Sequence, residues 1–138
     1  MEIISENDKK RIFLSGYRSL VTQEELALQR IQELRINKIC PTVVNDGMPH
    51  GNTTADLSGY AVLINELTEA LKNIRERADT SRRNILKSIK KMENKDEQIL
   101  LRLKYIQGLS MTESADMLGV SKRKSYDILN SAVENFEI

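Results

Sequence analysis

The stretch "YIQGLSMTESADMLGVSKRKSYDILNSA", residues 105–132, decides how the C-terminal part of the chain folds. Gly119 can take the left-handed backbone conformation in which helices commonly end, because it lacks a Cβ. Ser121 follows at the position of an N-cap, where a serine hydroxyl accepts a hydrogen bond from the first turn of a new helix. The pattern therefore predicts one helix over 111–118 and a second over 122–135.

The same signals recur earlier in the chain. Asn94 and Glu97 make an N-cap signature that opens a short helix at about 95–107, and Gly108 ends it. Ser110 then begins a capping box for the helix that follows. Three short helices, each with its own start and stop signal, predict a small unit that is separate from the rest of the chain.

The last two of these helices meet the requirements of a helix-turn-helix. Ala115 is small enough for the second helix to cross close to the first, and Gly119 supplies the turn four residues later. The apolar side chains that can hold the pair together are Leu118, Val120, Ile128 and Leu129. The residues expected to contact duplex DNA are Ser121, Lys122, Arg123, Lys124, Tyr126 and Asp127. Arg123 or Lys122 suits a guanine edge, and Lys124 suits a phosphate.

Two longer segments, residues 6–39 and 56–92, carry apolar side chains in alternating steps of four and three, as a coiled-coil seam requires. The seam positions of the first are Phe13, Tyr17, Leu20, Glu24, Ala27, Ile31, Leu34 and Lys38. Those of the second are Tyr60, Ile64, Leu67, Leu71, Ile74, Ala78, Ser81, Ile85, Ser88 and Met92. The predicted fold class is all-α: a long antiparallel coiled-coil hairpin over 1–94, followed by a three-helix helix-turn-helix domain over 95–138.

The connector "CPTVVNDGMPHGNTTAD", residues 40–56, holds both prolines of the chain and is predicted to be a loop. Thr53 and Asp56 form a capping box for the next helix. Neither Cys40 nor His50 has partner residues at metal-binding spacing, and no Ser–His–Asp or Cys–His set occurs. We therefore expect no catalytic site, no cofactor and no metal, and we do not expect an enzyme.

Basic residues are unevenly distributed, although the formal net charge is only +1. Residues 72–91 contain eight basic and two acidic side chains, whereas residues 95–138 contain six basic and seven acidic ones. A basic run near a helix C-terminus is commonly a solvated face that suits the helix dipole, but it also fits a phosphate footprint. The candidate phosphate contacts are Ser110, Thr112, Arg82, Arg83, Lys87, Lys90 and Lys91.

No apolar run approaches the roughly 20 residues that span a bilayer. The N-terminal residues lack the apolar core of a signal peptide, and a single cysteine gives no disulfide framework. These features lead us to expect a soluble protein of the cytoplasm with no membrane partner.

The segment "YIQGLSMTESADMLGVSKRK" resembles region four of bacterial sigma factors, in which a Tyr-x-x-Gly-x-Ser stretch leads into the helix-turn-helix. The matching residues are Tyr105, Gly108, Ser110, Glu113, Ala115, Leu118, Gly119, Val120 and Ser121. The whole chain resembles more closely a family of small phage and prophage proteins of Gram-positive bacteria. Those proteins join a helical hairpin, a connector with a Met-Pro-x-Gly motif, matched here by "GMPHG" at 47–51, and a sigma region four-like C-terminus. The resemblance implies a DNA-binding transcriptional regulator in a bacterial host cell, with double-stranded DNA and RNA polymerase as partners.

Two serines depart from the sigma pattern, because Ser114 and Ser125 stand where it has aliphatic residues. Each replacement of an aliphatic side chain by serine lowers the stability of the fold by on the order of 1–3 kcal/mol if the site is fully buried. Either the helices pack in a slightly different register, with Met117 and Tyr126 filling the space, or the hairpin or a partner chain supplies the packing.

Two other functions fit the same pattern. A protein-interaction adaptor would bind RNA polymerase or another regulator through the hairpin and have weak DNA affinity. A small terminase-like subunit for DNA packaging would also combine a helix-turn-helix with a coiled coil. Because a two-helix hairpin buries little surface by itself, we expect a homo-oligomer, with a dimer favoured.

Overall fold

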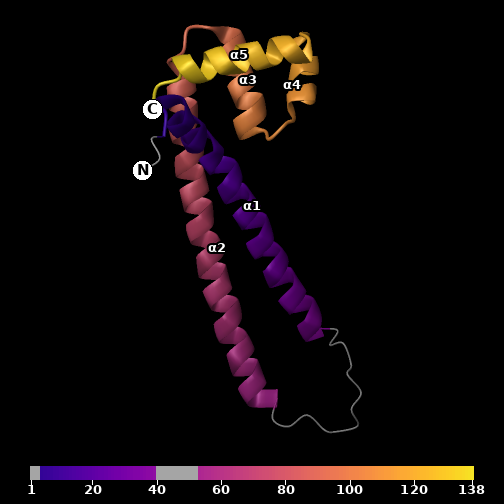
Figure 1. Cartoon of the computed structure of the whole chain (residues 1–138). Helices are drawn as coiled ribbons and strands as arrows, with labels where there is room; N and C mark the ends of the chain where they lie inside the picture. The colour runs from indigo at the N-terminus through magenta and orange to yellow at the C-terminus, as the bar shows by residue number, and fades with distance from the viewer. Residues whose placement is uncertain (1–3, 40–52) are drawn as a thin grey trace. The chain divides into compact units, whose positions relative to one another are not determined.

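The computed structural model describes residues 4–39 and 53–138 of the 138-residue chain. All regular secondary structure in these residues is helical (Figure 1). The helices are α1 (Glu6–Ile39), α2 (Thr53–Lys90), α3 (Lys95–Leu101), α4 (Met111–Leu118) and α5 (Lys122–Asn135), with a π-helical turn η1 (Arg102–Ile106) after α3. The all-α class is confirmed for the described residues, and the bounds of α1, α4 and α5 are those that the sequence predicts.

Smaller differences concern α2 and the connector. The helix expected from residue 56 already begins at Thr53, and it ends at Lys90. The predictions for Cys40, His50 and "GMPHG" lie outside the described residues, and the capping box of Thr53 and Asp56 rests on side chains that the structure does not describe. Within the described ranges, none of the helices combines the length and the apolar character needed to cross a membrane.

The described residues form two compact units. Unit 1 contains residues 4–20 and 77–138, and unit 2 contains residues 21–39 and 53–76. This division differs from the boundary that the sequence suggests near residue 94, because the first turns of α1 and the end of α2 belong to the same unit as α3, α4 and α5.

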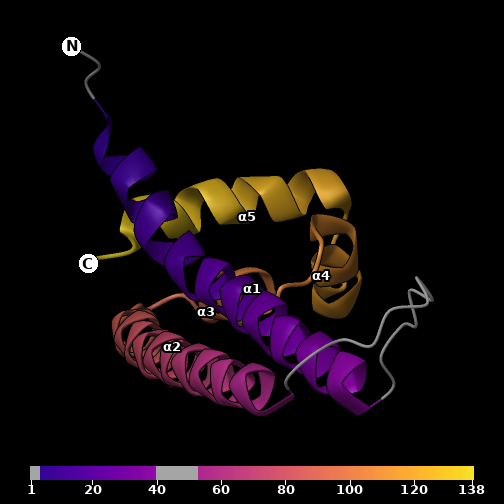
Figure 2. The same cartoon turned by 90° about the horizontal axis from the view of Figure 1, so that it is seen from below.

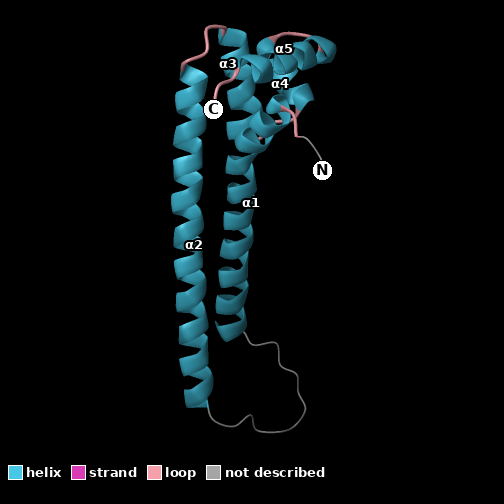
Figure 3. Ribbon diagram, turned by 60° about the vertical axis from the view of Figure 1, so that its left-hand side comes forward, coloured by secondary structure: helices cyan, strands magenta, loops and turns pink. Residues whose placement is uncertain are grey.

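Unit 2 consists of two helical segments that pack through their predicted seams. Ile31 and Leu71 are buried, and the other seam positions whose side chains are described are half-buried. The polar seam residue Glu24 accepts a hydrogen bond from Nε of Arg75 at 2.9 Å, which joins the α1 segment to the α2 segment. Figure 3 shows the two segments side by side.

Unit 1 has one apolar core, to which all of its helices contribute. Its buried members are Leu14, Ile85, Ile89, Met92, Leu100, Leu101, Tyr105, Met111, Leu129, Ala132, Val133 and Phe136. The ring of Phe136 lies 6.0 Å from that of Phe13, so the residue after α5 packs on α1. The three short helices therefore complete their core with side chains from α1 and α2.

Two cations of α1 also hold the C-terminal half of α5. Lys10 Nζ donates to the carbonyl oxygen of Glu134 at 2.9 Å. Arg11 donates to Oδ1 of Asn130 at 3.2 Å. Figure 2 shows the first turns of α1 crossing α5. Because these bonds join residues more than a hundred positions apart in the chain, they fix α5 against α1 rather than against its neighbours in sequence.

Candidate nucleic-acid interface

The turn between α4 and α5 has the chemistry that the sequence predicts. Gly119 has a φ of 72°, in the left-handed region, and its N–H donates to the Asp116 carbonyl at 3.2 Å. The hydroxyl of Ser121 accepts from the N–H of Lys124 at 3.1 Å and so caps α5. The start of α5 is thereby fixed by local hydrogen bonds.

The turn before α4 is held from outside as well as locally. Gly108 has a φ of 74°, and the hydroxyl of Ser110 accepts from the N–H of Glu113 at 3.1 Å. The guanidinium group of Arg18, on α1, lies directly over Gly108 and donates to the Ile106 carbonyl at 3.4 Å. The turn that precedes α4 is therefore in contact with α1.

The pairing of α4 with α5 includes both serines that depart from the sigma pattern. Ser114 and Ser125 are fully buried. The hydroxyl of Ser125 donates to the Lys122 carbonyl at 2.5 Å, whereas that of Ser114 has no hydrogen-bond partner among the described residues. Met117 is 65% exposed and Tyr126 is 44% exposed, so the alternative in which they fill the space is wrong. Met111 of α4 and Leu129 of α5 are instead buried in one core with residues of α1 and α2.

The six candidate DNA contacts at the start of α5 are all exposed: Ser121, Lys122, Arg123, Lys124, Tyr126 and Asp127. Lys122, Arg123 and Lys124 lie in its first turn, and none of the three has an ion-pair partner in the described part of the chain. The hydroxyl of Ser121 is engaged in its cap. Three unpaired cations in the exposed first turn of a helix can bind phosphate oxygens or base edges.

The candidate phosphate contacts fall into two groups. Ser110 and Thr112 lie at the start of α4, where both are exposed, although the hydroxyl of Ser110 is engaged as the N-cap. The second group lies on the last turns of α2 and on the residue that follows it, and consists of Arg82, Arg83, Lys87, Lys90 and Lys91, all of them exposed. Both groups belong to unit 1.

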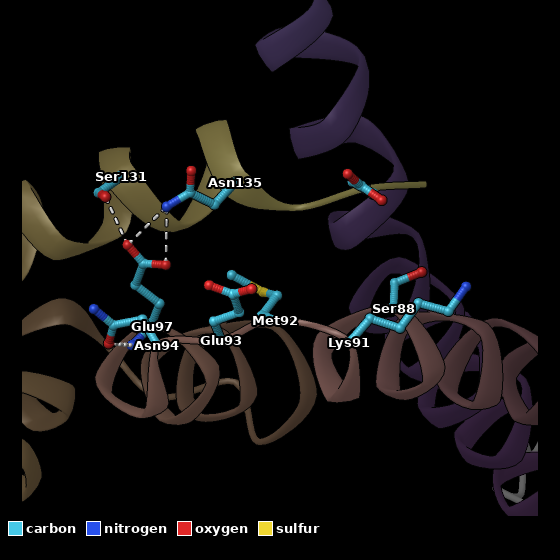
Figure 4. Close-up of a pocket in the computed structure, with 9 residues that line it drawn as sticks. Ser88, Lys91, Met92, Glu93, Asn94, Glu97, Ser131 and Asn135 are labelled. Carbon is cyan, nitrogen blue, oxygen red and sulfur yellow. Dashed lines mark hydrogen bonds between the residues drawn. The ribbon is translucent and has the colours of Figure 1, made fainter.

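Two adjacent polar pockets that the sequence did not predict lie beside α5; they share Asn94, Glu97 and Ser131 and are together called the groove here. Its larger part, about 500 Å³, is lined by Ser88, Lys91, Met92, Glu93, Asn94, Glu97, Ser131, Asn135 and Glu137 (Figure 4). Its smaller part, about 250 Å³, is lined by Asn94, Asp96, Glu97, Lys124, Asp127, Ile128 and Ser131. Of the predicted DNA contacts, only Lys124 and Asp127 line this groove. Of the candidate phosphate contacts, only Lys91 lines it.

The carboxylate of Glu97 is the most buried polar group of the groove. The residue is 4% exposed, and its Oε1 accepts from the Ser131 hydroxyl at 2.6 Å. Both carboxylate oxygens accept from Nδ2 of Asn135 at 3.2 Å (Figure 4). These bonds fix α3 against α5. No group of three metal-ligating side chains is placed to hold a metal ion in residues 4–39 and 53–138.

Sequence reasoning missed this role of Glu97, which it assigned to the N-cap signature of α3. The cap is confirmed, because Oδ1 of Asn94 accepts from the N–H groups of Asp96 and Glu97. The one trace of the cross-helix bonds in the sequence is the i, i+4 spacing of Ser131 and Asn135, which places both on one face of α5.

Two side chains of η1 have shifted pKa values. Burial raises the pKa of the Tyr105 hydroxyl, and the charge of Arg11 opposes this shift. Burial lowers the pKa of Lys104, and Arg11 lowers it further by repulsion. Lys104 Nζ lies 5.4 Å from the centre of the Tyr105 ring.

One protein family, described as "Protein of unknown function (DUF1492)", matches residues 38–137. The match takes in α2 to α5, and with them the groove and every candidate interface residue. No curated protein and no solved structure matches the chain.

Proposed function

The chain belongs to this family of unknown function, and we propose that it is a DNA-binding transcriptional regulator of phage or mobile-element origin. In this proposal α3, α4 and α5 form a sigma region four-like helix-turn-helix, and α1 and α2 form an antiparallel coiled-coil hairpin. Double-stranded DNA is the main ligand and RNA polymerase is a further partner. The working species is a homodimer in the cytoplasm of a bacterial cell.

The observation that carries the proposal is the first turn of α5. A recognition helix presents its N-terminal residues to the major groove, and this helix begins with three exposed, unpaired cations directly after a glycine turn. The guanidinium fork of Arg123 matches O6 and N7 of guanine, and an ammonium group such as that of Lys124 suits a phosphate. Asp127, one turn after Arg123, can accept from N4 of cytosine.

The start of α4 supports the same docking. The first N–H groups of a helix favour a phosphate, because they lack partners within the helix and carry the positive end of its dipole. Thr112 is exposed there and can donate its hydroxyl to a phosphate oxygen. Contacts from α4 would set the register of α5 in the groove, and α5 would read the sequence.

Selection of bound duplexes from a random-sequence pool tests the proposal. Wild-type protein should enrich one sequence motif, and the Arg123→Ala, Lys124→Ala double variant should bind the selected duplex at least about tenfold more weakly. The matched control is Arg30→Ala with Arg35→Ala, which removes the same charge from exposed positions of unit 2. A wild-type protein that enriches no motif would contradict the proposal, and so would a double variant that binds as well as wild type.

The acidic lining of the groove favours one second candidate, a protein-interaction adaptor. Glu93, Asp96 and Glu137 line it together with the buried carboxylate of Glu97. Such a surface repels phosphate and suits a basic segment of a partner protein. In this case the protein would co-purify with RNA polymerase after nuclease treatment, and the Arg123→Ala, Lys124→Ala variant would co-purify equally well.

A further inference from the structure

We propose that the last turns of α2 form a second DNA contact, which binds the phosphodiester backbone without reading its sequence. The contact consists of Arg83, Lys87 and Lys90 of α2 and of Lys91, the residue directly after it, and is called here the α2 stripe. The inference deepens the proposed function, because the stripe and the first turn of α5 would bind one duplex.

The α2 stripe lies on the solvent side of an amphipathic helix. Ile85, Ile89 and Met92 are buried in the core of unit 1. Arg83, Lys87 and Lys90 follow one another at i, i+4 and i+7, which places them on a single face opposite the buried one. Along the axis of α2 the three residues cover about 10 Å, and each strand of a duplex carries one phosphate per about 3.4 Å of the duplex axis. The stripe can therefore follow about three phosphates.

Most cations of the stripe are free to bind a ligand. All four side chains are exposed. Arg83 pairs with Asp79, but Lys87, Lys90 and Lys91 have no ion-pair partner within the described ranges. No acidic residue occurs between positions 80 and 92. The helix dipole accounts for cations in the last turn, but its effect does not extend back to Arg83.

The stripe and the proposed reading helix belong to the same compact unit. The buried face of α2 shares the unit 1 core with Leu129 and Val133 of α5. Lys91 and Lys124 also line the two parts of the groove along α5, which have Asn94, Glu97 and Ser131 in common. The end of the stripe and the first turn of α5 thus flank one groove.

The acidic groove between these two cationic surfaces determines how a duplex would bind. Glu93 and Asp96 line it and would repel a phosphate, so the backbone would contact the outer face of α2 rather than enter the groove. Helices α3 to α5 lie in a segment with more acidic than basic residues. A second cationic surface would therefore supply much of the sequence-independent affinity.

The test is the salt dependence of binding to a mixed-sequence duplex of about 30 base pairs, which reports phosphate contacts directly. The variant is Lys87→Gln, Lys90→Gln, Lys91→Gln. The matched control is Arg30→Gln, Arg35→Gln, Lys72→Gln, which removes the same charge from exposed positions of unit 2. Thermal unfolding of both variants should match wild type, since all six side chains are exposed.

We expect the slope of log affinity against log salt to become shallower by about 2–3 in the α2 variant and to stay unchanged in the control. Affinity for the selected motif and for mixed sequence should fall by the same factor, so that discrimination between them survives. The inference would be overturned if the α2 variant kept the slope of the wild-type protein. It would also be overturned if the slope changed equally in the α2 variant and in the control. A wild-type protein that binds duplex without sequence preference, through the stripe, would refute only the proposed function.

Discussion

Arg18 and Gly108, 90 positions apart in sequence, are in direct contact, and the guanidinium group of Arg18 occupies the space where a side chain at 108 would begin. A Cβ built on Gly108 would lie 2.6 Å from Cζ of Arg18. Gly119 has a similar φ of 72°, but a Cβ there would meet no atom within 4 Å. The two glycines share a backbone conformation and differ in their surroundings.

This difference predicts unequal effects of alanine at the two positions. Gly119→Ala should lower the free energy of unfolding by about 1–2 kcal/mol, the cost of the left-handed conformation. Gly108→Ala should lower it further, because Arg18 must also move. Urea unfolding measures both. In an Arg18→Ala background the difference between the two alanine variants should shrink, and a difference that persists would show that the contact does not restrict residue 108.

The buried hydroxyl of Ser114 predicts a stabilising substitution. Ser114→Ala removes a polar group that has no partner, which should raise the free energy of unfolding by about 1–3 kcal/mol. Ser125→Ala is the matched control, because that buried hydroxyl donates to the Lys122 carbonyl and its loss should cost about 1 kcal/mol. Opposite signs in urea unfolding are expected. If both variants lose stability, Ser114 has a partner in solution.

The carboxylate of Glu97 predicts a conservative substitution that is costly. Glu97→Gln replaces an oxygen that accepts from Asn135 by an amide that donates, so two donors face each other or one bond is lost. The free energy of unfolding should fall by about 1–3 kcal/mol. Glu93→Gln, on an exposed neighbour in the same groove, should change it by less than about 0.5 kcal/mol. If both variants change the free energy of unfolding by the same amount, the carboxylate of Glu97 does not have this structural role.

Burial of Tyr105 predicts a loss of stability at alkaline pH. Because its folded-state pKa lies above the usual 10.0, the unfolded chain releases this proton first, and stability falls as pH rises beyond that value. In the Tyr105→Phe variant the free energy of unfolding should fall less steeply as pH rises. Urea unfolding between about pH 9 and pH 11 compares the two proteins. An unchanged profile in the variant would mean that other groups cause the loss.

Local signals predicted most of the fold. The caps at Ser110 and Ser121 and the glycine turns at Gly108 and Gly119 depend on residues within one turn, so the sequence is enough to place them. The seams of α1 and α2 could also be predicted from the sequence, because buried side chains recur with the period of the helix. The bounds of α4 and α5 were therefore predicted without error.

Contacts between distant segments were not predicted. Nothing near Arg18 points to Gly108, and nothing near Glu97 points to Asn135, because a polar side chain on a helix has the same sequence signature whether it meets water or another helix. For the same reason the sequence places a boundary near residue 94, whereas the unit 1 core crosses it through Ile89 and Val133. The exposed first turn of α5 could be predicted, but the groove beside it could not.

The central claim is that the first turn of α5 reads DNA, and genome-wide mapping of bound DNA in a bacterial cell that expresses the tagged protein tests it most directly. We predict enrichment at one or a few promoters, and loss of that enrichment in the Arg123→Ala, Lys124→Ala variant at equal protein level. Absence of enrichment for wild type, or the same map for both proteins, would contradict the claim.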